Sequence, residues 1–476
     1  MKKIIFSLLS VFLFLGCVPN IEKQKVIKDT KIEQEFIEDL NSFQSVNLKL
    51  QNNWWRKFED KQLNSLIENA IKNTPSLKAL KQRYAKANSL VKMRKSANLP
   101  NIGFGADVSR QRFSENYIFP APLGGNYYNL YQFGLNLDYE FDFWDKRASL
   151  IRASLNEALA QKAYIKVKEL SVSTSIAKLY ISLNYKNREL EQLQILKKIT
   201  NEKHHILDKV HKLGLSNRKE INESGSSIEK INQKISDLRI EIEDIKRSIA
   251  IISGMMPSQM DKLEKTDIAD DYKVFIPKDI HLDILSHRPE IAMQKYLLLS
   301  KSAYIKNAKA QFYPNISLNG LLNFTSFPWS SLFNHTSFAP LGAVAFSLPL
   351  FDAGKREANL NIKVSDYNEQ VQLYNQSVIK AVNEVVNSLR KLELTKSNLK
   401  YQDEILKKKN KNLQIEKRIY EIGLNNKISY LNSKLLLQEE ILKNISLKDK
   451  ELNAQIDLIK ALGGGYKSER IDVSHN

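Results

Sequence analysis

The chain has one cysteine, Cys17, among its 476 residues, so it can form no internal disulfide. Beyond its N-terminus it lacks any run of about 18 apolar residues, the length that a transmembrane helix needs. Glycine and proline number only 16 and 12, and neither occurs from 145 to 213 or from 355 to 422. These absences predict two very long helices and leave β-strands as the only means of crossing a membrane.

The N-terminus has the pattern of an export signal over residues 1–16. Lys2 and Lys3 precede an apolar stretch, and Gly16 precedes the lone cysteine. A cysteine directly after a small residue at the end of such a stretch resembles the bacterial lipoprotein signal, which implies a lipidated Cys17. Ordinary cleavage, with Cys17 incidental, is the alternative.

The sequence repeats itself at an interval of about 210 residues. Lys146 and Lys355, each followed by arginine, lie 209 positions apart, and so do Gly214 and Gly423. Upstream, a Pro-Asn-Ile motif recurs after 214 residues. Because prolines and glycines coincide as well as composition, the pattern indicates an internal duplication with a short insertion or deletion.

Both long helices are predicted to form coiled coils. In the second, apolar residues recur in steps of seven at Val371, Val378, Val385, Leu392, Leu399, Leu406, Leu413 and Tyr420, and the first repeats this at Ile176, Leu183 and Leu190. Shorter return helices are predicted over 217–253 and 425–462. Each half therefore contains a helical hairpin with its tip at Gly214 or Gly423.

Four segments alternate between apolar and polar residues, as strands do when one face meets lipid and the other meets water. Residues 134–143 alternate strictly, and three partners begin near Ile102, Ile316 and Val344. A soluble sandwich with a half-buried sheet is the alternative. Because an open sheet edge is not stable in hydrocarbon, four strands per chain predict a barrel shared between chains. Three copies give twelve strands, whereas an eight-stranded barrel would be filled by its own side chains.

Several motifs together carry a resemblance to a known family. They are Trp54-Trp55, Ser286-His287-Arg288-Pro289-Glu290-Ile291, Phe312-Tyr313-Pro314-Asn315-Ile316, Leu348-Pro349-Leu350-Phe351-Asp352-Ala353-Gly354 and the two Gly-Leu tips. In order and spacing the chain resembles the TolC-like outer-membrane factor family, specifically the lipoprotein branch of tripartite RND-type efflux pumps. This implies an α+β membrane protein in which a long α-helical coiled-coil barrel continues into a twelve-stranded transmembrane β-barrel.

The resemblance also implies partners and a location. These are a homotrimer, outer-membrane lipid, a periplasmic adaptor (membrane fusion protein) and an inner-membrane RND-type pump. The expected division of the chain is signal peptide 1–16, lipidated strap 17–53, equatorial segments 54–99 and 255–312, barrel hairpins 100–144 and 313–351, periplasmic helical hairpins 145–254 and 352–463, and tail 464–476.

Candidate functional residues fall into three groups. On the polar strand faces, Asp107, Asp138, Glu140 and Asp142 are expected to line the lumen, where they either favour cations or only keep it wet. The resemblance places adaptor contacts at Leu213, Gly214, Leu215, Ser216, Ile422, Gly423 and Leu424, although these could be plain turn residues. It places a tunnel gate at Glu220, Glu223, Tyr420, Asn425, Ser429 and Asn432.

The gate departs from the family pattern. Related proteins often carry acidic residues where this chain has Asn425, Ser429 and Asn432, so a second-half carboxylate gate is in doubt. Glu220 and Glu223 share a helix face and could supply six carboxylates per trimer, or they could simply be solvated.

An enzyme and a nucleic-acid binder are both disfavoured. The histidines at 204 and 205 are adjacent and point apart on a helix, and the glycines at 463–465 end a helix where phosphate would need a helix start. The net charge of +19 comes from lysines scattered along helices, so no nucleic acid, metal or cofactor is expected. The remaining alternatives to drug efflux are type I protein secretion and a coiled-coil envelope spacer.

Overall fold

The computed structural model describes residues 23–24, 52–116, 118, 120–215, 217–261, 263 and 287–467. The predicted signal peptide, Cys17, most of the strap, Ser216, residues 264–286 and the last tail residues lie outside this range. Among the helices of the described part, none is both long and apolar enough to cross a membrane.

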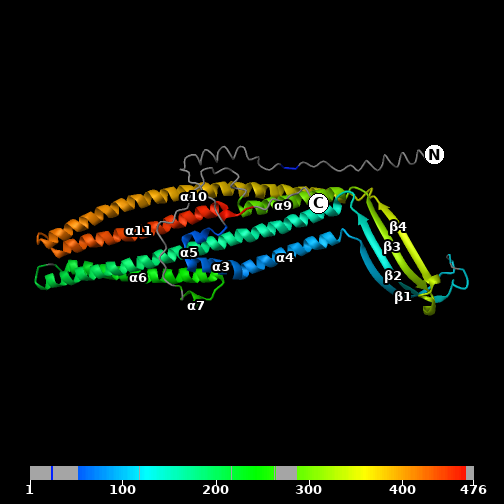
Figure 1. The fold of residues 1–476 in the computed structure, drawn as a ribbon, viewed down its shortest axis with the longest axis horizontal. Coiled ribbons are helices and arrows are strands. Elements are labelled where there is room, and N and C mark those ends of the chain that lie inside the picture. Colours follow the sequence, from blue (N-terminus) through cyan, green and yellow to red (C-terminus); the bar gives the residue numbers. More distant parts are fainter. Residues whose placement is uncertain are drawn as a thin grey trace. The chain divides into compact units, whose positions relative to one another are not determined.

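The order of elements repeats, as the duplication predicts (Figure 1). The first half contains α4 (Pro75–Ser96), β1 (Asn101–Arg112), β2 (Tyr127–Phe141), α5 (Lys146–Lys212) and α6 (Arg218–Ser253). The second contains α9 (Pro289–Ala310), β3 (Asn315–Ser326), β4 (Phe338–Ser347), α10 (Lys355–Glu421) and α11 (Lys427–Ala461). Equivalent elements match in length, since α5 and α10 each have 67 residues and α4 and α9 each have 22.

Shorter elements flank the two halves. They are η1 (Trp54–Phe58), α3 (Lys61–Asn73), α7 (Pro257–Met260), η2 (Trp329–Ser331), η3 (His335–Ser337) and η4 (Gly463–Gly465). Asp60 starts α3 by accepting a hydrogen bond from the Leu63 amide at 2.8 Å, as an N-cap residue does.

The chain divides into two compact units. The sheet unit comprises Arg83–Gln161 and Gln294–Tyr374, with the described pair Lys23 and Gln24. The helical unit comprises the described parts of Ile27–Gln82, Lys162–Met293 and Asn375–Asn476.

The sheet unit contains an antiparallel sheet in the order β1-β2-β3-β4. Its register places Phe104 opposite Leu135, and Leu135 opposite Leu322, so the apolar residues of adjacent strands share one face. Asp138 lies opposite Asn319 on the other face. The predicted separation into one apolar and one polar face is therefore confirmed.

Two strand boundaries differ from the prediction. β2 starts at Tyr127, seven residues earlier than its strict alternation, and ends at Phe141, so Asp142 lies beyond it. β4 starts at Phe338 and includes Pro340, which interrupts the sequence pattern of a strand. Proline is tolerated there because β4 is an edge of this four-stranded sheet, where one side of the strand needs no amide donor.

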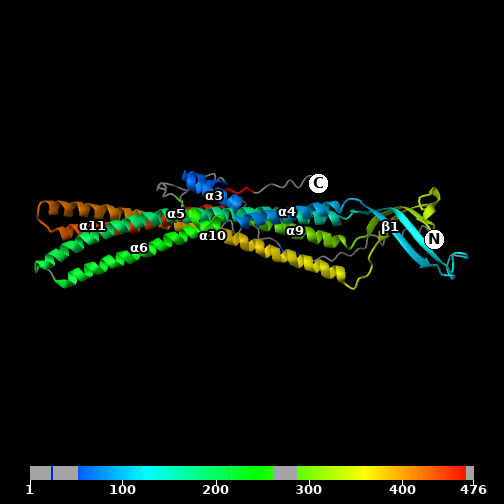
Figure 2. The same ribbon diagram turned by 90° about the horizontal axis from the view of Figure 1, so that it is seen from below.

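The heptad seam of α10 is confirmed in its buried part. Val371, Val385 and Leu392 are at most 1% exposed, whereas the later seam positions 399 to 420 are only partly buried. In the helical unit, η1 and α3 pack their apolar residues against α5, α6 and α11 in a single core. Figure 2 shows α5 paired with α6, and α10 with α11.

Polar contacts join the two hairpins of the helical unit through α5 and α11. Asp457 of α11 accepts hydrogen bonds from Lys178 of α5 at 2.6 Å and Lys391 of α10 at 3.0 Å. About two turns earlier in α11, the Asp449 carboxylate accepts a hydrogen bond from the Ser182 hydroxyl of α5 at 2.9 Å. The hairpins thus adhere through charged and polar side chains as well as through the apolar core.

Replacement of Asp449 by asparagine is expected to stabilise the protein at neutral pH. Burial raises the pKa of Asp449, although hydrogen bonds from Ser182 and Asn453 and the charge of Lys186 oppose the shift. Because the folded pKa lies above the unfolded one, the cost of the carboxylate grows as pH rises through the folded pKa and disappears below the unfolded pKa. Thermal unfolding should therefore show a higher Tm for Asp449→Asn at pH 7.5 and no difference near pH 3. A lower Tm at pH 7.5 would contradict this.

Candidate functional site

Both hairpin tips end their long helices with the same hydrogen-bonded turn. Gly214 and Gly423 have φ values of +74° and +75°, in the left-handed region that glycine adopts without a steric penalty. The Leu215 amide donates to the Val210 carbonyl and the Leu424 amide to the Ile419 carbonyl, each at 3.0 Å. These are Schellman motifs, which close a helix and reverse the chain. The predicted tips are confirmed as turns.

The tips expose apolar side chains to an unusual degree. Leu213, Leu215, Ile422 and Leu424 are between 68% and 77% exposed. Apolar side chains on a turn gain nothing from water and are typical of a surface that another protein covers. Their role as adaptor contacts remains a prediction, and Ser216 lies outside the described residues.

The second-half gate candidates are held by short-range contacts. The ring of Tyr420 stacks on that of Tyr430 at 5.9 Å, and the Asn425 amide donates to Glu416 at 3.1 Å. Asn426 caps α11 by accepting from the Ser429 amide at 2.9 Å. These contacts join Tyr420 at the end of α10, Asn425 in the turn and Ser429 in the first turn of α11 to neighbouring residues.

The remaining gate candidates are solvent-facing. Asn432, Glu220 and Glu223 are exposed, and the Lys219 ammonium lies 3.9 Å from the Glu223 carboxylate. Asn217 caps α6 by accepting from the Glu220 amide at 3.2 Å. A carboxylate in the first turn of a helix also interacts favourably with the helix dipole. The gating role of these residues remains a prediction.

An ion pair near the tips was not anticipated from the sequence. Glu202 of α5 and Lys427 of α11 approach to 2.7 Å and connect the first hairpin to the second. Hydrogen bonding to Lys427 lowers the pKa of Glu202, and hydrogen bonding to Glu202 raises that of Lys427. The partners are 225 positions apart, so no periodic pattern in the sequence could have indicated them.

The four candidate lumen acids have different surroundings. Asp107 is exposed on the polar face, and Asp138 accepts a hydrogen bond from Asn136 at 3.2 Å. Glu140 is neutralised by Lys146 at 2.9 Å and Arg147 at 2.7 Å. Among the described residues, no cation pairs with Asp107 or Asp138 on the strands.

The sequence predicts that Asp142 continues the polar face of the strand. In the structure Asp142 follows the end of β2 and caps a helix. Its carboxylate accepts from the amides of Arg147 at 3.1 Å and Ala148 at 2.7 Å, in the first turn of α5. The alternation of apolar and polar residues over 134–143 continues past the end of β2 into the cap. The sequence pattern therefore could not distinguish the last strand residue from the capping residue.

Removal of this cap is expected to destabilise the sheet unit measurably. Asp142→Ala leaves two amides of α5 without an acceptor and should cost about 1–2 kcal/mol, whereas Asp142→Asn should retain most of the stability. Urea unfolding followed by circular dichroism measures both. Equal stability of the alanine variant and the natural chain would contradict the capping role.

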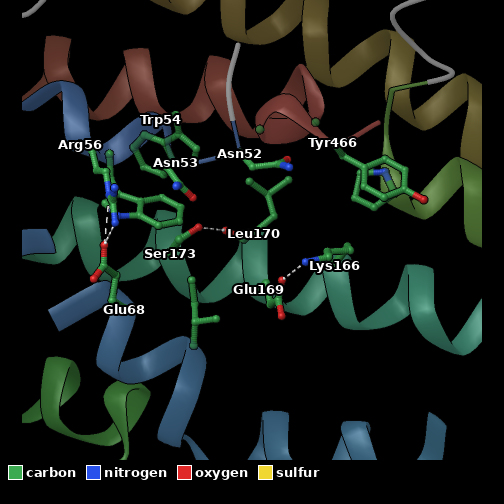
Figure 3. Close-up of a pocket in the computed structure, with 15 residues that line it drawn as sticks. Asn52, Asn53, Trp54, Arg56, Glu68, Lys166, Glu169, Leu170, Ser173 and Tyr466 are labelled. Atoms are coloured by element: carbon green, nitrogen blue, oxygen red, sulfur yellow. Dashed lines mark hydrogen bonds and ion pairs between the residues drawn. The ribbon is translucent and has the colours of Figure 1, made fainter. Parts of the chain in front are cut away.

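A cavity of about 340 Å³ lies in the helical unit (Figure 3). Its walls contain two ion pairs, Arg56 with Glu68 at 2.6 Å and Lys166 with Glu169 at 2.8 Å. The indole nitrogens of Trp54 and Trp55 are buried and form no hydrogen bond with the described residues. No group of His, Cys, Asp or Glu that could hold a metal occurs among the described residues.

Comparison with known proteins relates most of the chain to one family. A model of the outer membrane efflux protein family matches residues 66–254 and 282–464. The putative multidrug resistance outer membrane protein MdtQ of Escherichia coli K12 is 26% identical over 470 residues, covering 96% of this chain and 97% of its own length. The multidrug resistance outer membrane protein MdtP of the same strain is 25% identical and covers 87% and 86%.

Solved structures agree in fold. VceC, an outer membrane protein of Vibrio cholerae, has a TM-score of 0.79 and 24% identity, covering 88% of this chain and 100% of its own. The CmeC outer membrane channel of Campylobacter jejuni has a TM-score of 0.78 and 24% identity, covering 94% and 95%. At this identity the likeness shows a shared fold.

Proposed function

Because the chain belongs to the outer membrane efflux protein family, we propose that three copies form a passive exit duct for small amphiphilic compounds, including drugs, across the outer membrane and periplasm. Such a duct conducts and performs no chemistry, so no residue is assigned a catalytic role. The names of the relatives MdtQ and MdtP, which refer to multidrug resistance, support drugs as the class of substrate.

The observation that carries the proposal is a four-stranded sheet with one apolar face and two unpaired edges. β1 and β4 each have one neighbouring strand, and an apolar sheet in lipid cannot leave a row of amides and carbonyls unpaired. Pairing β1 of one copy with β4 of the next satisfies both edges. Three copies then close a twelve-stranded barrel whose polar faces enclose water.

The exposed apolar tips support docking of a second protein at the far end of the helices. We assign this partner as a periplasmic adaptor that connects the duct to an inner-membrane RND-type pump. Helical hairpins on the adaptor would bury the leucine and isoleucine side chains on either side of Gly214 and Gly423. A lipid anchor at Cys17 completes the proposal.

Deletion of the gene tests the function directly. Cells without it should accumulate more of a fluorescent amphiphilic dye than the parent strain, and the natural gene supplied on a plasmid should restore low accumulation. Unchanged accumulation together with loss of a secreted protein would instead assign the duct to type I secretion. Unchanged accumulation and secretion would favour a structural role in the envelope.

The lipid anchor is tested separately. Cys17→Ser is expected to abolish incorporation of radiolabelled palmitate into the protein, because its hydroxyl replaces the thiol that accepts the lipid. The barrel should still hold the protein in the outer membrane, so membrane fractionation should change little. Palmitate incorporation into Cys17→Ser would exclude this cysteine as the acceptor.

A further inference from the structure

In the sheet unit, four helix ends lie next to one another where they meet the strands. The Arg147 guanidinium at the start of α5 donates to the Ala97 carbonyl just after α4. The Asn307 amide near the end of α9 donates to the Lys146 carbonyl at 2.8 Å. Asn359 of α10 donates to Gln311, just after α9, at 3.3 Å. The ends of α4 and α9 and the starts of α5 and α10 therefore form one layer.

At the helix starts in this layer, three cations are paired with carboxylates of the same chain. Glu140 pairs with both Lys146 and Arg147, and Asp352 pairs with Arg356 at 2.7 Å. These cations have carboxylate partners within the chain and do not need an external anion.

The helix ends are different. From Arg83 to Ser96, α4 carries five cations and no acid, and from Gln294 to Ala310, α9 carries four cations and no acid. Near the C-terminal ends of these helices lie Arg94 and Lys95 of α4 and Lys306 and Lys309 of α9, which we call the junction cations. None of the four forms an ion pair with a residue in the described part of the chain. One cation per helix end would complement the helix dipole, but that does not explain why both of these helix stretches lack an acid.

Two of the junction cations, Lys306 and Lys309, lie near a further positive charge, Lys23. Lys23 lies over the ring of Tyr367 at 5.5 Å, and the Gln24 amide donates to Asn368 at 3.0 Å. Burial lowers the pKa of Lys23, and the charges of Lys309 and Lys306 lower it further. Three lysines thus repel one another at this surface, which favours binding of an anion between them.

Exposed apolar residues lie in the same layer. Leu99 and Phe143 are each 64% exposed, and Leu350 and Phe351 are 83% and 89% exposed. The Trp144 ring stacks on Tyr313 at 4.8 Å. An apolar sheet face bordered by aromatic rings and then by free cations is the order of groups that matches hydrocarbon, interface and charged headgroups of a bilayer.

We propose that the junction cations bind the phosphate groups of anionic phospholipids in the membrane leaflet on the helix side of the sheet. This inference rests on the proposed placement of the sheet in a membrane, and it assigns the class of lipid that the protein selects there. Contact with the headgroups would fix the depth of the sheet and offset the repulsion among the lysines.

The test uses the full-length protein purified in neutral detergent and native mass spectrometry to count bound lipid. The probes are phosphatidylglycerol and phosphatidylcholine, which differ in headgroup charge. The variant replaces Arg94, Lys95, Lys306 and Lys309 with glutamine. The matched control also uses glutamine and removes the same number of positive charges. It replaces four exposed lysines of α10 in the helical unit: Lys396, Lys400, Lys408 and Lys411.

The natural protein and the control are expected to bind phosphatidylglycerol at least about ten-fold more tightly than phosphatidylcholine, since each cation near an anionic surface adds to the attraction. The junction variant should retain less than about two-fold preference. Equal preference in the variant and the natural protein would overturn the proposal. So would loss of the trimer in the variant alone, which would show that these cations contact a neighbouring copy.

Lipid binding is measured without transport, so the outcome is separable from that of the dye experiment. A protein that exports dye but shows no phosphatidylglycerol preference would retain the proposed function and lose this inference. A protein that prefers phosphatidylglycerol but exports no dye would retain this inference and lose the proposed function.

Discussion

Cells that carry Gly423→Trp in place of the natural chain are expected to accumulate amphiphilic dye to the level of cells that lack the gene. A Cβ at this position meets no atom of the chain within 4 Å, so the indole would project from the tip. There it would obstruct docking of the proposed adaptor while leaving the hairpin folded. The intramolecular cost is that of a non-glycine residue at φ +75°, about 1–2 kcal/mol.

The matched control for this variant is Gly423→Asn. Asparagine tolerates the left-handed conformation better than other side chains and adds little bulk, so dye export should remain near the natural level. Immunoblots of outer-membrane fractions should show equal amounts of both variants. Normal export by a Gly423→Trp protein present at the natural level would rule out docking at this tip.

Loss of Arg288 is expected to have the largest effect on stability. Its side chain is only 4% exposed and contacts both Glu290 and Glu384, while its Nη1 donates to the Ala381 carbonyl at 3.1 Å. Arg288→Met would leave two partly buried carboxylates and a carbonyl without their donor. Breaking a buried ion pair from one side costs about 3–5 kcal/mol, and the lower value is expected because both glutamates retain some contact with water.

The control is Arg56→Met, which breaks the ion pair with Glu68. Both side chains are about half exposed, and exposed pairs contribute at most about 1 kcal/mol. Urea unfolding monitored by circular dichroism would compare the two variants with the natural protein. Similar losses in both would mean that Arg288 is no more than a surface charge.

Much of the local structure was predictable because it is written in long periodic patterns. The heptads of α10 extend over fifty residues and specify a helix with one apolar line, and the alternation of β2 specifies which side chains share a face. Gly214 and Gly423 predicted the reversals because few other residues adopt the conformation that ends those helices. The offset of 209 residues predicted two equivalent halves.

Where local patterns overlapped, the sequence reading was less accurate. Asp142 continues the alternation of β2 although it caps α5, and Pro340 conceals the start of β4. In both cases a neighbouring element determines the role of the residue. A helix start supplies free amides in the first case, and an unpaired strand edge tolerates proline in the second.

The sequence by itself therefore determined the duplicated halves, the long helices, the two-faced strands and the glycine tips, because each depends on residues that are close in the chain. Only the tertiary structure decided the pairing of Glu202 with Lys427, the burial of Arg288 and the meeting of the ends of α4 and α9 with the starts of α5 and α10. These contacts join residues tens to hundreds of positions apart. No periodicity encodes them, because their energies arise only after packing has brought the charges together.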